Sequence, residues 1–331
     1  MGDFLQKVKS RIFSVMSTEP SLGLCVFGKH PAWDDHMDDI GEQSRDMQEF
    51  KRIIYVEGIG RNIDSGTWAQ LSVDQRLPEF NHLLVYSRDS HYFWATLSAS
   101  TDGKGRSLYP LVVALQSRGF SPAKVERQIC PLLLELRDSL QNTDSADEVR
   151  TKVSATQQKI QTIAAKQLTP VNTKANHSMT GDQVAMLFAN EEPVAASRIF
   201  YATQRAIDAI SHDPADAPTE SLRLPLNDQQ KWFSARMWCS LIHSMLGAAY
   251  PVSAIEYWSP KDKTDNRNDF VDLIIGEPKP AALFCLRAGL ARMPLVSDIP
   301  FELNPQFLQQ VRDYLTVCRS AGDKPAPSFL S

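Results

Sequence analysis

The residues of this sequence best suited to chemistry lie in an acidic stretch near its start, WDDHMDD at residues 33–39. Its carboxylates and imidazole could hold a divalent cation, because carboxylates suit hard cations and imidazole suits transition metals. One hypothesis is therefore a metal-dependent hydrolase that uses Asp34, Asp35, His36 and Asp38. The spacing does not match the calcium-binding loop pattern, however. We favour an ordinary role without metal, in which the acids cap the N-terminus of a helix or line a solvated loop.

A second segment, TDGKGRS at residues 101–107, combines glycines with Lys, Arg and Ser, as phosphate-binding loops do. A P-loop requires GxxxxGK[ST] between a strand and a helix, whereas this segment joins two predicted strands. We therefore interpret it as a tight turn. Lys104 and Arg106 would project from its tip, where an anion or an acidic partner could contact them.

No other group of residues in the sequence indicates catalysis or a cofactor. The segment EGIGRNIDSG at residues 57–66 has Ile63 where a dinucleotide-binding motif needs its third glycine. The sequence contains neither GxSxG nor HExxH. We therefore expect a protein that is not an enzyme and that needs no cofactor.

The composition excludes several classes of protein. Of the 331 residues, 43% are hydrophobic and 22% are charged, which is typical of a folded globular chain. The formal net charge of −4 gives no basic excess for binding nucleic acid. Five cysteines without CxxC spacing indicate buried thiols in a reducing compartment. With no secretory signal and no apolar run of membrane-spanning length, we expect a cytoplasmic location.

The first residues predict an element of their own. Apolar residues at helical spacing over residues 3–17 predict an amphipathic helix, so that 1–20 would form an N-terminal helical segment. We favour packing of this helix on its own domain. Docking on a partner is a second possibility, and membrane contact is a weak one, since one short basic face anchors poorly. A membrane-recruited platform module is the corresponding alternative function.

The rest of the chain predicts an α+β fold. Apolar runs bounded by turn residues predict strands at 22–28, 82–88, 91–100, 107–115, 252–258, 269–276 and 281–287. Helical spacing predicts helices at 44–54, 121–140, 145–166, 193–211, 227–245 and 305–318, with a loop over 30–41. Strands followed by helices, twice over, indicate a largely antiparallel sheet covered by helices. Residues 21–319 would form this domain, with a helical insertion at 141–225 and a flexible tail at 320–331.

Short motifs in this order resemble the TagF/ImpM proteins of bacterial type VI secretion. The first is FGKxPxxxD, in which the matching residues run from Phe27 to Asp35. Trp68 and a GR segment followed by YPL come next, and Trp258 and the run GLARMPLVSDIPF at 289–301 complete the resemblance, which covers most of 21–319. Its motif residues are Gly28, Lys29, Pro31, Asp35, Trp68, Gly105, Arg106 and Pro110. Asp34 stands where the family usually has Gly, and His36 where it has Phe.

The resemblance implies a cytoplasmic accessory protein that controls assembly of a secretion machine by binding other proteins. Its partners would be scaffold or regulatory proteins of that machine, among them a forkhead-associated scaffold. Strands 22–28 and 107–115 could be neighbours, which would place the matched residues on one surface and pair Asp35 with Arg106. We therefore predict a partner-binding surface formed by Lys29, Trp33, Asp35, Lys104 and Arg106.

Overall fold

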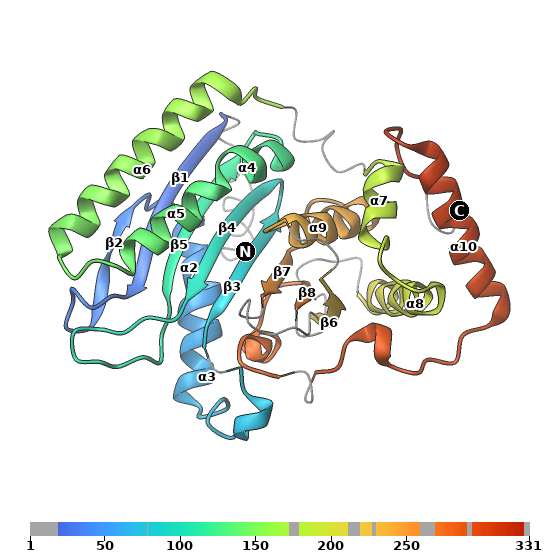
Figure 1. Cartoon of the computed structure of the whole chain (residues 1–331), viewed down its shortest axis with the longest axis horizontal. Coiled ribbons are helices and arrows are strands. Elements are labelled where there is room, and N and C mark those ends of the chain that lie inside the picture. Colours follow the sequence, from blue (N-terminus) through green and yellow to red (C-terminus); the bar gives the residue numbers. More distant parts are fainter. Residues whose placement is uncertain are drawn as a thin grey trace, which may run out of the picture.

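An eight-stranded antiparallel sheet forms the centre of the molecule (Figure 1). The computed structural model describes residues 19–77, 79–171, 179–210, 219–226, 230–258, 269–289 and 293–327. The strand order is β2-β1-β5-β4-β3-β7-β8-β6, and all neighbouring strands run antiparallel. The strands are β1 (Ser21–Lys29), β2 (His36–Gly41), β3 (Asn81–Arg88), β4 (His91–Ser98), β5 (Leu111–Arg118), β6 (Glu220–Pro225), β7 (Val252–Tyr257) and β8 (Phe270–Ile275).

The sheet separates two hydrophobic cores. Strand β1 shows why, since almost all of its residues are buried and successive side chains point to opposite faces. Leu24 and Val26 face the larger core, whereas Cys25 and Phe27 face the smaller one. A strand buried on both faces has a continuous run of apolar residues. The run LGLCVF therefore predicts this buried strand from the sequence.

Helices cover both faces of the sheet. The larger core lies under α4 (Pro122–Gln128), α5 (Cys130–Leu140), α6 (Ala146–Gln167) and α9 (Phe233–Leu246). The smaller core is closed by α2 (Arg45–Lys51), the π-helix η1 (Arg52–Gly60), α3 (Arg61–Asp64) and the 3-10 helix η5 (Ala282–Leu286). The predicted α+β class, with a largely antiparallel sheet covered by helices, is therefore confirmed.

Three further helices form a lobe beside the β6 end of the sheet, at the right of Figure 1. They are α7 (Gly181–Leu187), α8 (Pro193–Ala209) and α10 (Pro305–Ala321). The short helix η6 (Val296–Asp298) packs against α8 and β6, and η2 (Val73–Gln75) lies between α3 and β3. Stacking of Phe188 on Phe200, with ring centroids 4.4 Å apart, joins α7 to α8. Trp238 of α9 meets Phe188 edge-on and connects the lobe to the sheet-covering layer.

Several predicted elements need correction. Residues 36–41 form strand β2 instead of a loop, and 281–287 contain η5 instead of a strand. The strand predicted from 107 begins at Leu111, so the β4–β5 connection is longer than a tight hairpin turn. The insertion contains the expected helices at 145–166 and 193–211, as α6 and α8, but it also adds strand β6 to the sheet.

The two ends of the predicted domain stand differently. The amphipathic helix predicted for residues 3–17 lies outside the described residues. At the other end, α10 continues to Ala321, two residues into the predicted tail, and the chain then pairs with the lobe. Lys324 O accepts the N–H of Gly181 at 2.9 Å, and the N–H of Ala326 donates to Met179 O at 2.8 Å.

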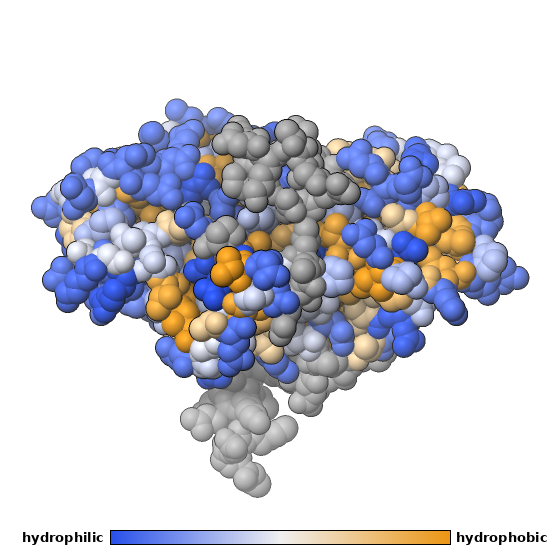
Figure 2. All heavy atoms as spheres, turned by 60° about the horizontal axis from the view of Figure 1, so that its bottom comes forward, coloured by the Kyte–Doolittle hydropathy of each residue, from blue (hydrophilic) through white to orange (hydrophobic). Residues whose placement is uncertain are grey.

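The surface is mostly hydrophilic on the face shown in Figure 2, with separate apolar patches. Among the described residues the most exposed large apolar side chains are Val56, Val73, Leu108, Met186, Val194, Met245 and Val317. None of the helices in the described part of the chain combines the length and the apolar character needed to cross a membrane. All five cysteines are free and buried, as expected.

Candidate functional site

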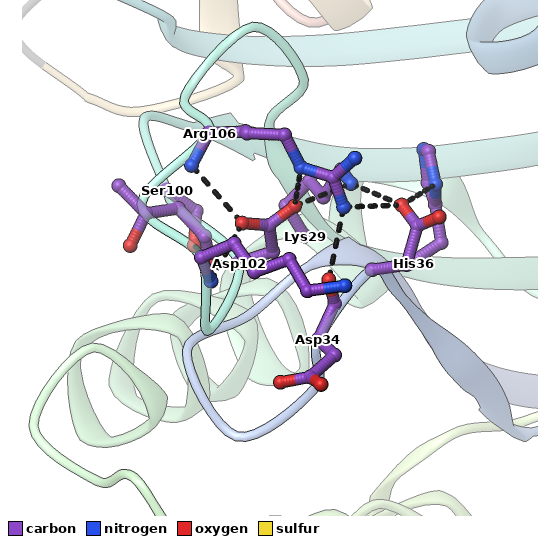
Figure 3. A network of polar contacts seen from close by, with 9 residues as sticks. Lys29, Asp34, His36, Ser100, Asp102 and Arg106 are labelled. Carbon is purple, nitrogen blue, oxygen red and sulfur yellow. Dashed lines mark hydrogen bonds and ion pairs between the residues drawn. The ribbon is translucent and has the colours of Figure 1, made fainter.

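The candidate site lies where the β1–β2 connection (30–35) meets the β4–β5 connection (99–110), and Figure 3 shows it from close by. Strands β1 and β5 are neighbours, as predicted, so the two connections emerge at the same end of the sheet. Gly28 has φ of 115°, and a Cβ there would lie 2.2 Å from Pro110 O. Glycine at position 28 therefore permits this close approach of the two backbone segments. The next residue, Lys29, then donates its N–H to Pro110 O at 3.2 Å.

A buried ion pair forms the centre of the site. Nζ of Lys29, which is 4% exposed, donates to Asp102 Oδ2 at 2.8 Å and to Asp35 Oδ1 at 2.5 Å. The Asp102 side chain is fully buried, whereas 67% of the Asp35 side chain is exposed. Buried charges are costly unless they are paired and hydrogen-bonded. Lys29 thus bridges an inner and an outer carboxylate.

Asp102 also shapes the β4–β5 connection. Its Oδ1 accepts the backbone N–H groups of Lys104 and Arg106, each at 3.0 Å, and its own N–H donates to Arg106 O at 3.2 Å. Burial by itself would raise the pKa of Asp102, but hydrogen bonds from Lys29 and Arg106 hold that pKa well below its usual range. The carboxylate is therefore ionised at neutral pH, and the turn around it is rigidly held.

Arg106 carries this network to the solvent. Its Nε donates to Asp102 Oδ2 at 2.7 Å and its Nη2 to Asp34 O at 2.9 Å. The same Nη2 lies 3.2 Å from Asp35 Oδ1, so the predicted contact between Asp35 and Arg106 is present. The hydrogen bond from Lys29 lowers the pKa of Asp35 to about 2. About half of the Arg106 side chain is exposed, at 52%, and it forms the outer edge of the site together with Asp35.

Trp33 joins the two connections to helix α6. Its carbonyl oxygen accepts the N–H of Gly103 at 2.7 Å, and the guanidinium of Arg150 in α6 lies 5.6 Å from its ring centroid. Arg150 also pairs with Asp38 of β2 at 3.3 Å. The half-buried Trp33 is thus partly engaged in internal packing, whereas Lys104 at the tip of the turn is exposed.

The acidic stretch does not assemble into a metal site. Its carboxylates diverge toward different cations: Asp35 toward Lys29 and Asp38 toward Arg150. No group of three or more His, Cys, Asp or Glu side chains within the described ranges could hold a metal ion. Nor do the acids cap a helix, because residues 36–41 form an edge strand. Asp34, Asp35 and His36 are exposed, so the solvated-loop interpretation fits the start of the stretch.

Trp68 lies away from the site. It is buried in the smaller core, where its Nε1 donates to Phe284 O at 3.3 Å and its ring meets Phe80 edge-on. The other motif residues of the two connections gather at the site, including the exposed Pro31 and the buried Pro110.

Two residues of the site were not singled out from the sequence. Asp102 looked like an ordinary turn residue in a glycine-rich loop. A usable signal was present, because an Asp followed by Gly favours a turn in which the carboxylate accepts backbone N–H groups two residues on. His30 is fully buried and contacts the end of α5, and no local pattern in the sequence indicated this.

No model of a known protein family matches the sequence, and a search of curated proteins finds no match. The resemblance to TagF/ImpM proteins stays a prediction that depends on short motifs and their order.

Proposed function

We propose that this protein is a non-enzymatic, cytoplasmic accessory protein of a bacterial type VI secretion or related contractile system, which controls assembly by binding a protein partner. The single observation that carries the proposal is the network of Lys29, Asp102, Arg106 and Asp35. Its inner half is buried and its outer half faces water. The order of the motifs supports the class of secretion system, and the network supports the position of the contact surface.

The charge balance of the surface favours a protein partner over a polyanion. The exposed cations Lys104 and Arg106 are matched by the exposed Asp34 and Asp35, so the surface has no excess of positive charge. Recognition of nucleic acid needs a clear excess of positive charge. The side chain of Leu108, 59% exposed in the same connection, adds an apolar contact. An exposed apolar side chain two positions from an exposed Arg is a combination that protein–protein interfaces use.

Affinity purification of the tagged protein from its own cell tests the proposal. We expect secretion-system scaffold or baseplate proteins with the wild type and their loss with the Asp35→Ala, Arg106→Ala double variant. The matched control is Glu49→Ala, Arg52→Ala, which removes another exposed ion pair, whose Nη2–Oε1 distance is 2.5 Å, away from the site. The control should capture the same partners as the wild type.

Metal analysis of the same eluates and membrane fractionation of a truncated variant test the two alternative functions. About one divalent metal ion per chain and no partner protein would favour the hydrolase and overturn the proposal. Equal capture of partners by both double variants would also overturn the proposal. Membrane recovery that disappears on removal of residues 1–18, with no loss in the site variant, would favour the platform module.

A further inference from the structure

We propose that His30 is a positioning residue of the proposed surface, and that protonation of its imidazole releases the β1–β2 connection and so weakens partner binding in acid. The proposal rests on the function proposed above for its biological consequence. The structural step that it describes can be measured without any partner.

The contacts of His30 require one neutral tautomer. The side chain is completely buried, and its Nδ1 accepts the backbone N–H of Ala32 at 3.2 Å. Nδ1 can accept only when it carries no proton, so the proton of the neutral ring is on Nε2. Nε2 then donates to Leu140 O at 3.0 Å, which ties the connection to the C-terminal end of α5.

His30 also orders the residues that follow it. Its carbonyl oxygen accepts the N–H of Trp33 at 3.0 Å, and its ring meets the Trp33 ring edge-on, with centroids 5.6 Å apart. Ala32 and Trp33 lead directly to Asp34 and Asp35, which contact Arg106. The orientation of the imidazole therefore determines where the acidic half of the surface lies.

A second proton would break this arrangement on one side. It would place an N–H on Nδ1, facing the N–H of Ala32, and two donors would then oppose each other. The contact with Leu140 O would survive, because Nε2 keeps its proton. The outcome expected is local release of residues 31–36, with α5 and the sheet unchanged.

The charges around His30 do not cancel this effect. Asp144, from the α5–α6 connection, favours the protonated ring, and Lys152 of α6 disfavours it. Lys152 is itself paired with Glu148 at 2.7 Å. Burial is the largest influence and lowers the pKa of His30 below its ordinary value of 6.5. The closed connection is thus stable at neutral pH and is lost as the pH falls.

Hydrogen–deuterium exchange of the full chain, read by mass spectrometry at several pH values, tests the proposal. The protection factor, corrected for intrinsic exchange, should fall for residues 31–36 by up to about tenfold per pH unit below 6.5. Protection of β4 should stay constant over the same range. Constant protection of residues 31–36 from neutral pH to about one unit below the ordinary histidine value would overturn the proposal.

Two substitutions separate the roles of the ring nitrogens. His30→Asn places an oxygen near the position of Nδ1, so residues 31–36 should stay protected and lose their pH dependence. His30→Gln reaches toward Leu140 O but lacks the Nδ1 acceptor, so protection should be low at every pH. The control His36→Gln removes an exposed histidine of the same region and should keep the wild-type response. An unchanged pH response in folded His30→Asn would contradict the proposal.

The outcomes distinguish this proposal from the proposed function. If exchange follows the expected pattern but no partner is captured, His30 is a proton-sensitive positioning residue and the functional assignment fails. If partners are captured through Asp35 and Arg106 but protection does not depend on His30, the function stands and this inference fails.

Discussion

Two buried ion pairs lie in different parts of the sheet and serve different ends. Lys29 and Asp102 form one between the β1–β2 and β4–β5 connections. Arg223 of β6 and Asp272 of β8 form the other, directly across two paired strands. The second pair is bidentate, with Nε–Oδ1 and Nη2–Oδ2 distances of 2.6 and 2.7 Å, and neither side chain is more than 4% exposed.

The difference lies in what each cation does beyond its partner. Arg223 turns inward: its Nη1 donates to Ala288 O and Met293 O, each at 3.3 Å, and its guanidinium lies 3.8 Å from the Phe270 ring centroid. It thereby holds the backbone at Ala288 and Met293. Asp102, in contrast, is shared with the half-exposed Arg106. The sealed pair of Arg223 and Asp272 holds β6, β8 and the backbone after η5 together, whereas the pair of Lys29 and Asp102 opens to water and positions side chains that a partner can reach.

Breaking the sealed pair should have the largest effect on stability. Asp272→Ala leaves a buried guanidinium without its carboxylate, and we expect the free energy of unfolding to fall by about 3–5 kcal/mol. Urea denaturation followed by circular dichroism measures this. Arg223→Met, Asp272→Leu should recover much of the loss, because an apolar pair of similar volume leaves no buried charge. A small loss in the single variant would mean that the pair is not sealed from water.

Breaking the buried pair of Lys29 and Asp102 should lower the free energy of unfolding by less. Lys29→Met removes one of several donors to Asp102, and Arg106 and two backbone N–H groups still satisfy that carboxylate. We expect a loss of about 1–3 kcal/mol in the same denaturation experiment. A loss equal to that of Asp272→Ala would contradict the distinction between the two pairs.

Acid should weaken the open network in a defined pH window. Asp35 has a lowered pKa of about 2 in the folded protein against an ordinary value of 3.8, so the folded state binds fewer protons. Its contribution to stability is complete above 3.8 and is lost as the pH falls through about 2. Urea denaturation over this range should therefore show a shallower acid dependence for Asp35→Asn than for the wild type. Equal dependence would contradict the ion pair with Lys29.

The elements that could be predicted are those whose buried residues form a recognisable apolar pattern in the sequence. Strands β3, β4, β7 and β8 are buried runs bounded by polar or turn residues, and α8 and α10 have apolar residues at helical spacing. Strand β2 could not be found in this way, because only Met37 of its six residues is buried and pairing with β1 is made by the backbone. Residues 281–287 were wrongly predicted as a strand, because their apolar residues suggested one. Three of these residues are instead buried in the 3-10 helix η5, without the alternation of a strand.

The site could be predicted only in part, for a related reason. Neighbouring strands β1 and β5 carry Lys29 and the connection to Arg106, and this proximity follows from the order of the strands. The central role of Asp102 depends on its burial and on its contact with Lys29, 73 residues away in the sequence, and both are tertiary properties. The same holds for His30, whose partner Leu140 lies 110 residues further along the chain.

The outer edge of the open network tests the central claim most directly, because stability and binding should separate there. Arg106→Ala should lower the free energy of unfolding by only about 1–2 kcal/mol, because Lys29 and two backbone N–H groups still satisfy the buried Asp102 carboxylate, yet it should abolish capture of the partner. Arg52→Ala, which changes an arginine of similar exposure in η1, is the matched control. We predict partner capture by the wild type and Arg52→Ala but not by folded Arg106→Ala; equal capture by all three would contradict the account.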